Sequence, residues 1–592
     1  MSWARRHATG LLALLLGLIG FSAVFLHAPQ VGYTRDESFY FAAAESYAGW
    51  FQALGRDADR ALSEPVIRRH YENNREHPVL IKNLMALTYL ALAPEPDPRP
   101  AGRTTGQAGA YGRAMRLPAQ VFSALAVVLT FLLGAAVASR RVGLVAALAF
   151  LLAPRHFFHA QLACFDMPAV TVWLAVVLAW RRARGSAGWA LLTGLAWGAA
   201  LATKHNSFFI LPVLGLHWLV VEGRALSLDR RGLHLPRIPL ALIAMLVFGP
   251  LIFIGHWPFL WHDTLERLGW YFGFHLDHVN YHWEYFGRLL TDPPFPWAYP
   301  FAVTALTLPL PTLLLGGWGF FTEAGRRLGR PLAAAGGALA RLAGLRTPAR
   351  EERGARAPAE PELERSDGWL LLLNAFIPFA VIALPAVPIF GGVKHWLHAM
   401  PFVCVLGALA LERMIDRLPA HWRRGRRRPA WTAGLAALAL APSLAGLLWI
   451  GPYGTSFYNA LAGGTAGAAD LGMQRQYWSN NVTGVLPWLN RNLPPGARVF
   501  FHEVTGKSFA AYKRDGWLRA DVRPAWGPQR ADFCVYQYHR EFVDVQYRIW
   551  NLLGHRSIAH GLYLDQVPMV LVYDCRDENR IQRPRPGGAQ AR

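Results

Sequence analysis

About eleven apolar runs, each long enough to cross a lipid bilayer, constrain the fold of this chain more than any other feature. Of its 592 residues, 53% are hydrophobic, which is typical of a polytopic membrane protein rather than a soluble enzyme. The sequence therefore predicts an α-helical membrane protein with about eleven transmembrane helices. The runs lie at 10–28, 115–138, 141–158, 167–181, 187–203, 206–222, 238–256, 298–321, 368–388, 393–413 and 430–450.

The connections between these runs alternate in charge. By the positive-inside rule, the alternation places the N-terminus in the cytoplasm and the C-terminal tail outside a bacterial-type inner (plasma) membrane. The net charge of +22 comes largely from these basic connections, as the positive-inside rule predicts. We therefore expect the lipid bilayer to be a partner and do not expect nucleic-acid binding. The basic connections are 139–141, 181–184, 222–237, 322–367 and 412–428.

Two long connections interrupt the helices. The external connection 29–114 is expected to contain helices at 38–54 and 78–92, followed by a loop at Ala93–Gly109. The cytoplasmic connection 322–367 is rich in Ala, Gly, Arg and Glu, and it is expected to be a flexible linker. We assign all of 1–450 to one transmembrane module.

The tail, 451–592, changes character near residue 484. Strand patterns at 497–501, 532–536 and 569–573, with helical stretches between them, predict a small external α/β domain. Cys534 and Cys575 lie at the ends of two such strands. An external compartment would allow a disulfide between them, and two unpaired buried cysteines fit the pattern equally well.

Strongly polar residues gather at the external ends of the predicted helices. Carboxylates at membrane depth are costly, so Asp36-Glu37 and Asp166 indicate a functional site. A single His or Lys at such a place is more often an interfacial or snorkelling residue. The set comprises Asp36, Glu37, Glu76, His77, Lys82, Arg155, His156, His159, Asp166, Lys204, His205, Asn206, Lys394, His395 and His398.

Acids, cations and apolar helices together predict group transfer from a lipid phosphate. A carboxylate would accept the proton of an attacking hydroxyl, and cations would stabilise the departing phosphate. The alternatives are a membrane transporter of a lipid-linked or small solute, and a non-catalytic scaffold. The sequence shows no inverted repeat or pair of broken helices, and a large external domain is more natural for an enzyme.

Several segments resemble the GT-C glycosyltransferases of the protein O-mannosyltransferase and aminoarabinose-transferase type (family 39-like). The residues DESFY at 36–40 and EHPVLIK at 76–82 resemble the first external loop of that family, although Val79 replaces its second Pro. His77, Pro78, Leu80 and Lys82 fit the mannosyltransferase form, whereas Glu76 fits the aminoarabinose form. Further similar segments are ACFDMP at 163–168, ATKHN at 202–206, GGVKHWLHAMP at 391–401 and YNALAGG at 458–464.

The resemblance implies a glycosyltransferase that uses a polyprenyl-phosphate sugar donor, with inversion. Asp36 would be the base, Glu37 would assist or orient it, and Asp166 would be the second acidic site. Lys82, Lys204, Lys394 and His395 would bind the donor phosphate, with Arg155 behind them. Glu76, His77 and His398 would bind substrate. The sugar and the acceptor, whether protein, lipid or glycan, stay open.

The resemblance implies no required cofactor, although a divalent metal stays open because Asp36, Glu76 and Asp166 could supply oxygen ligands. The aromatic segment 270–286 is expected to form an external amphipathic helix that caps the cavity. Its His275, His278 and His282 would then share one helical face, with Asp277 beside them, and could contact the sugar or a metal.

Overall fold

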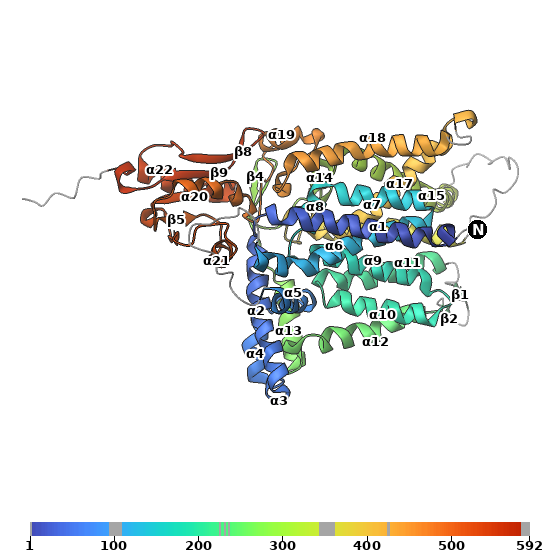
Figure 1. Ribbon diagram of the computed structural model, residues 1–592. Coiled ribbons are helices and arrows are strands. Elements are labelled where there is room, and N and C mark those ends of the chain that lie inside the picture. The colour runs from blue at the N-terminus through green and yellow to red at the C-terminus, as the bar shows by residue number, and fades with distance from the viewer. Residues whose placement is uncertain are drawn as a thin grey trace, which may run out of the picture.

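The computed structural model describes residues 3–93, 109–223, 227–229, 232–234, 237–342, 362–422 and 427–581. It shows a bundle of helices with a small mixed α/β region at one end (Figure 1). The predicted fold class is therefore confirmed. The bundle helices are α1 (Trp3–His27), α6 (Ala110–Val137), α7 (Arg140–Leu152), α8 (Pro154–Ala160), α9 (Asp166–Ala183), α10 (Ala187–Leu201), α11 (Ile210–Glu222), α12 (Leu240–Gly255), α14 (Tyr299–Thr307), α15 (Leu310–Leu342), α16 (Glu362–Ile382), α17 (Met400–Arg417) and α18 (Arg427–Ile450).

Every predicted apolar run overlaps one of these helices or a consecutive pair, although the run 393–413 begins seven residues before α17. By length and composition, five helices in the described ranges could cross a membrane, or six if the bent pair α7–α8 is one span. The remaining bundle helices are shorter or carry more charge, so this measure supports fewer spans than the sequence predicted.

Two runs predicted as single helices are broken, and both breaks lie at a proline. α7 and α8 are bent by 76°, and Pro154 begins α8, where its missing N–H costs nothing. α14 and α15 are separated at Leu308, whose extended backbone is the conformation favoured before Pro309. Both breaks fall within the predicted spans 141–158 and 298–321.

The predicted helices of the first long connection form as α2 (Arg35–Arg56) and α5 (Leu80–Leu92), with α3 (Ala58–Ala61) and α4 (Glu64–Tyr71) between them. α2 lies across the end of the bundle (Figure 1). Its start is fixed by a capping box, in which the Thr34 side chain accepts from the Glu37 N–H and Glu37 accepts from the Thr34 N–H. The predicted loop Ala93–Gly109 lies largely outside the described residues.

Two expectations about connections are wrong. The segment 322–342 belongs to the long helix α15 and is not a flexible linker, because its Ala-rich composition favours helix; 343–361 lie outside the described residues. The helix predicted at 270–286 is α13 (Thr264–Leu276), which ends ten residues early. A hairpin of β3 (Trp283–Tyr285) and β4 (Arg288–Leu290) follows it. At the other end of the bundle, β1 (Ser227–Asp229) pairs with β2 (Gly232–His234).

The C-terminal region contains a five-stranded sheet in the order β6-β5-β7-β9-β8. The three predicted strands are present as β5, β7 and β9. β5 is parallel to β6 and β7, whereas β9 is antiparallel to β7 and β8. The elements are α19 (Gly464–Asp470), α20 (Leu486–Asn492), β5 (Arg498–Phe501), α21 (Gly506–Arg514), β6 (Arg523–Pro524), β7 (Phe533–Gln537), α22 (Val543–Leu553), β8 (His560–Leu564) and β9 (Val567–Asp574).

Alternate residues of β7 and β9 belong to two different cores. Val535 and Val572 join the large core that continues into the bundle, whereas Tyr536 and Tyr573 pack on the opposite face with α22. Cys534 and Cys575 are joined by a disulfide on that second face, with their Cα atoms 6.2 Å apart. The sheet is therefore anchored to the bundle by one of its faces.

Candidate active site

A cavity of about 750 Å³ lies where the bundle end meets the C-terminal region. Its wall combines α2, the turn before α5, the start of α9, α13, the segment after α16 and residues of the C-terminal sheet region. One side is apolar, formed by Ile377, Val381, Ile382 and Val387. Of the polar set singled out from the sequence, those that line the cavity are Asp36, Glu76, His77, Asp166, Lys204, His205, Asn206, Lys394, His395 and His398.

Asp36 is the second residue of α2, and its side chain is 28% exposed. Lys394 Nζ lies 3.4 Å from Asp36 Oδ2, which is a long ion pair. The same ammonium lies 4.7 Å from the ring centres of Phe390 and Trp478. Asp36 therefore keeps lone pairs available on the cavity side, and Lys394 is held mainly by aromatic faces.

Lys394 belongs to a tight turn, the 3₁₀ helix η5 (Gly392–His395). Gly391 has φ +63°, and a Cβ there would lie 2.5 Å from Lys394 Cε. Both the left-handed backbone and the space taken by the lysine stem require glycine at this position. The glycine pair predicted from sequence as a motif thus shapes the turn that presents Lys394.

Asp166 has a more enclosed setting at the first turn of α9. Its side chain is 6% exposed, and Lys204 Nζ lies 2.6 Å from Oδ1. The ring of His159 lies on the other side, with Nδ1 3.3 Å from Oδ2. The helix N-terminus adds a favourable field for the carboxylate. This carboxylate is therefore fixed by its neighbours before any substrate binds.

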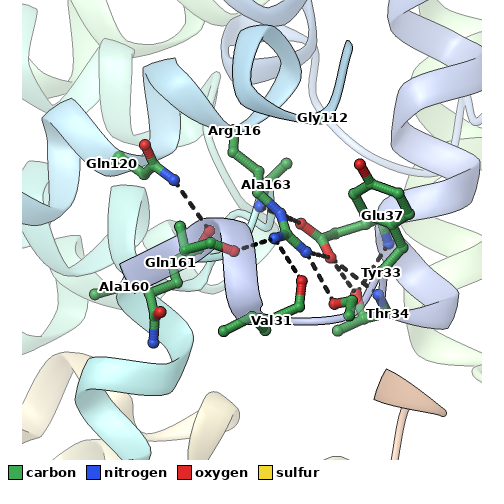
Figure 2. A network of polar contacts seen from close by, with 12 residues as sticks. Val31, Tyr33, Thr34, Glu37, Gly112, Arg116, Gln120, Ala160, Gln161 and Ala163 are labelled. Carbon is green, nitrogen blue, oxygen red and sulfur yellow. Dashed lines mark hydrogen bonds and ion pairs between the residues drawn. The ribbon is translucent and has the colours of Figure 1, made fainter. Parts of the chain in front are cut away.

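Glu37 does not line the cavity, although it follows Asp36 in the chain. Its carboxylate is fully buried and faces Arg116 of α6, with Arg116 Nε donating to Oε1 at 2.7 Å (Figure 2). The same oxygen accepts from the Ala163 N–H at 2.8 Å. The two neighbouring carboxylates thus point into different environments, one toward the cavity and one toward the protein interior.

Lys82 and Arg155 also lie outside the cavity wall. Lys82 Nζ donates to the carbonyl oxygens of Asn74 and His77, at 2.6 and 3.0 Å, and to the Asn74 side chain. Lys82 therefore holds the turn that carries Glu76 and His77. Arg155 lies behind the Lys394 turn, since a Cβ at Gly392 would be 3.2 Å from its Nη1.

Histidines crowd the wall formed by α13 and the turns around it. His205 stacks on His275, with ring centres 3.9 Å apart, and His275 Nε2 contacts the Glu76 carbonyl oxygen. The expectation of three His on one helical face is wrong, because α13 ends at Leu276, before His278 and His282. Within the described ranges, no group of three or more His, Cys, Asp or Glu is arranged to hold a metal ion.

Several cavity residues were not predicted from the sequence. Arg35 pairs with Glu503 at 3.4 Å, and Glu541 and His539 line the cavity beside them. Burial raises the pKa of Glu541 to about 7, with a smaller contribution from Glu503, and burial lowers the pKa of His539 to about 3. The positive φ values of Trp478 and Glu503 are the kind of strained backbone found at functional sites, but only a structure reveals them.

These features define a polar cavity with an apolar wall at one end of the helical bundle. Comparison with known families confirms the predicted resemblance to the GT-C glycosyltransferases. Residues 107–253, less than half of the chain, match the family described as dolichyl-phosphate-mannose-protein mannosyltransferase. That stretch includes Asp166 and Lys204, whereas Asp36, Glu76 and Lys394 lie outside it.

Two solved structures are similar to the chain over most of its length. ArnT from Cupriavidus metallidurans, bound to undecaprenyl phosphate, is 14% identical with a TM-score of 0.46, covering 96% of this chain and 98% of that chain. The oligosaccharyltransferase AglB from Archaeoglobus fulgidus, in complex with an inhibitory peptide and a dolichol-phosphate, is 12% identical with a TM-score of 0.46, covering 90% and 70%. No curated protein matches the chain.

Proposed function

We propose that the protein is a glycosyltransferase that moves a sugar from a polyprenyl-phosphate donor to a hydroxyl acceptor. The observation that carries the proposal is a single cavity that joins an accessible carboxylate, Asp36, to a weakly paired ammonium, Lys394, beside an apolar wall. The apolar wall suits a lipid tail, and the two charged groups suit the reacting end of the donor. The family match at 107–253 supports the same reaction class.

In the proposed reaction, the acceptor hydroxyl attacks the anomeric carbon of the donor sugar, and Asp36 takes the hydroxyl proton. A new C–O bond forms to the acceptor oxygen. The bond between the anomeric carbon and the phosphate oxygen breaks on the opposite face, with inversion. The electron pair leaves with the polyprenyl phosphate, where Lys394 stabilises the developing negative charge. No step is assigned to a metal.

Other predicted site residues surround the two reacting groups. Asp166 fixes Lys204 at 2.6 Å, so that this second ammonium is rigidly placed at the cavity wall. His77, His395 and His398 also line the cavity, and Arg155 adds positive charge behind the Lys394 turn. Rigid cations cost less to reorganise when a phosphate develops charge than mobile ones do.

The test measures transfer of a labelled sugar from polyprenyl-phosphate donors in membranes that contain the protein. Asp36→Asn is the matched variant, which we expect to be inactive. The expected result is a covalently labelled acceptor whose formation depends on Asp36. The proposal is wrong if the labelled compound crosses sealed proteoliposomes without covalent change, which would indicate a transporter, or if Asp36→Asn and Asp166→Asn both leave transfer intact.

The proposed reaction takes place at the external face of a bacterial-type inner membrane, with the N-terminus in the cytoplasm and the C-terminal region outside. The alternation of basic connections supports this orientation. Asp577 offers a site for its test, since its side chain is 91% exposed in the C-terminal region. Asp577→Cys in intact spheroplasts should react with a membrane-impermeant maleimide. Labelling only after lysis would reverse the orientation.

A further inference from the structure

Arg116 of α6, which no sequence motif identified, is buried at the cavity end of the bundle and is fully hydrogen-bonded. Its Nε and Nη2 donate to the two oxygens of Glu37, at 2.7 and 2.8 Å. Nη1 donates to the carbonyl oxygens of Ala28 and Val31, and Nη2 also donates to Gly32 O at 2.9 Å. All five N–H groups of the guanidinium are therefore used, and the side chain is 1% exposed.

Glu37 connects Arg116 to the segment before α9, which contains Ala163. Oε1 accepts from the Ala163 N–H at 2.8 Å, and Oε2 accepts from the Thr34 N–H at 2.9 Å (Figure 2). Glu37 directly follows Asp36 in α2, and Ala163 lies three residues before Asp166. One buried ion pair thus holds both backbone segments that carry the acidic groups of the cavity.

We propose that Arg116 is a positioning residue that, through Glu37, sets the relative places of Asp36 and Asp166. The inference deepens the proposed function and rests on it. Glu37 is a positioning residue too, because each of its oxygens already accepts from at least two donors and neither oxygen faces the cavity. Group transfer is sensitive to shifts of about 1 Å, so a pair that ties both carboxylate segments together matters for rate.

The arrangement does more than pair two buried charges. A buried ion pair is weak evidence for stability, because packed apolar side chains of similar volume often serve as well. An apolar pair would, however, leave the carbonyl oxygens of Ala28, Val31 and Gly32 and the Ala163 N–H buried without these partners. The pair is therefore suited to holding backbone segments in one geometry.

The first part of the test does not depend on transfer activity. Hydrogen–deuterium exchange is compared between the wild-type protein and Glu37→Gln, Arg116→Lys and the neutral pair Arg116→Gln/Glu37→Gln. The matched control is Arg181→Lys, which alters a bidentate pair with Asp367 at the opposite end of α9. We expect peptides covering 28–37 and 161–166 to lose protection together in the Glu37 and Arg116 variants only. Unchanged protection at 161–166 would overturn the coupling.

The second part measures transfer by the folded variants. The expected result is a fall in kcat of about 10- to 100-fold, with a KM for the donor within twofold of wild type and an unchanged pH profile. Full kcat in the folded neutral pair would overturn the positioning role. A lost acidic limb of the pH profile in Glu37→Gln would make Glu37 the base instead. A wild-type protein without transfer, but with coupled exchange, would contradict the proposed function and leave the coupling standing.

Discussion

The two acidic sites of the cavity differ in how tightly the protein holds them. Asp36 is 28% exposed and lies 3.4 Å from Lys394, whereas Asp166 is 6% exposed and lies 2.6 Å from Lys204. His159 closes the other side of Asp166, at 3.3 Å. One site is open and loosely paired, and the other is enclosed and fully engaged.

The different surroundings of the two carboxylates indicate different roles for Asp36 and Asp166. A general base needs a lone pair that reaches the acceptor proton, which the open setting of Asp36 provides. A buried carboxylate with a close ammonium is stabilised as a charge and gives up its partner only at a large cost. Asp166 is therefore suited to fixing Lys204, and Asp36 is suited to proton transfer.

The largest expected effect is on the open site. Asp36→Asn should lower kcat for sugar transfer about 10³-fold, because an amide cannot take the proton of the attacking hydroxyl. Its thermal unfolding temperature in detergent should stay close to that of wild type, since the long pair with Lys394 is partly exposed. The measurement combines single-turnover transfer with a thermal unfolding curve. If Asp36→Asn lowered the unfolding temperature as much as Asp166→Asn does, the distinction between the two sites would be wrong.

At the enclosed site, Asp166, we expect a substitution to affect stability strongly and activity less than at Asp36. Asp166→Asn leaves Lys204 without its carboxylate partner, so we expect a loss of unfolding free energy of about 3 kcal/mol and a fall in kcat of about 10²-fold. Asp166→Asn/Lys204→Met removes both charges and should recover most of the stability but not the activity. If this double variant recovers activity as well, Asp166 acts only through stability.

Topology made part of this site predictable. The apolar runs and the alternating basic connections bring Asp36, Asp166, Lys204 and Lys394 to one end of the bundle, and the structure shows these residues around one cavity. The resemblance over 163–168 and 202–206 falls within the stretch that matches the family. Membrane topology is a property that hydropathy and charge record directly.

Side-chain direction was not predictable in the same way. Glu37 and Lys82 belong to the same motifs as Asp36 and His77, but they point into the protein, where they bind backbone groups. Adjacent residues of a helix face different directions, and a motif alone does not say which one meets the cavity. Glu503 and Glu541 are far from the bundle in sequence, so only tertiary packing reveals their place in the wall.

A third change tests the cations of the two sites. Lys394→Gln should weaken binding of the proposed polyprenyl-phosphate ligand about 10-fold, because the long ion pair with Asp36 leaves the ammonium able to bind a phosphate. Lys204→Gln should instead lower the thermal unfolding temperature, because it leaves Asp166 buried without its ammonium. Native mass spectrometry in nanodiscs measures the first effect. Equal affinities in the two variants would contradict the assignment of Lys394.

A fourth prediction concerns the pH dependence of folding stability, through Glu541 in the cavity wall. Burial raises the pKa of Glu541 to about 7, and the charge of Glu503 adds to the rise. The unfolded chain then releases this proton at lower pH than the folded protein does. Between about pH 4.5 and pH 7, folding stability should therefore fall as the pH rises, by roughly 2 kcal/mol after solvent screening.

Glu541→Gln removes this titration and keeps the size of the side chain. Its unfolding free energy should match that of wild type near pH 4.5 and exceed it by roughly 2 kcal/mol at pH 8. Asp544→Asn, in the exposed first turn of α22, is the control for removing one carboxylate from the same region. A Glu541→Gln curve parallel to wild type across this range would place Glu541 in a solvated setting.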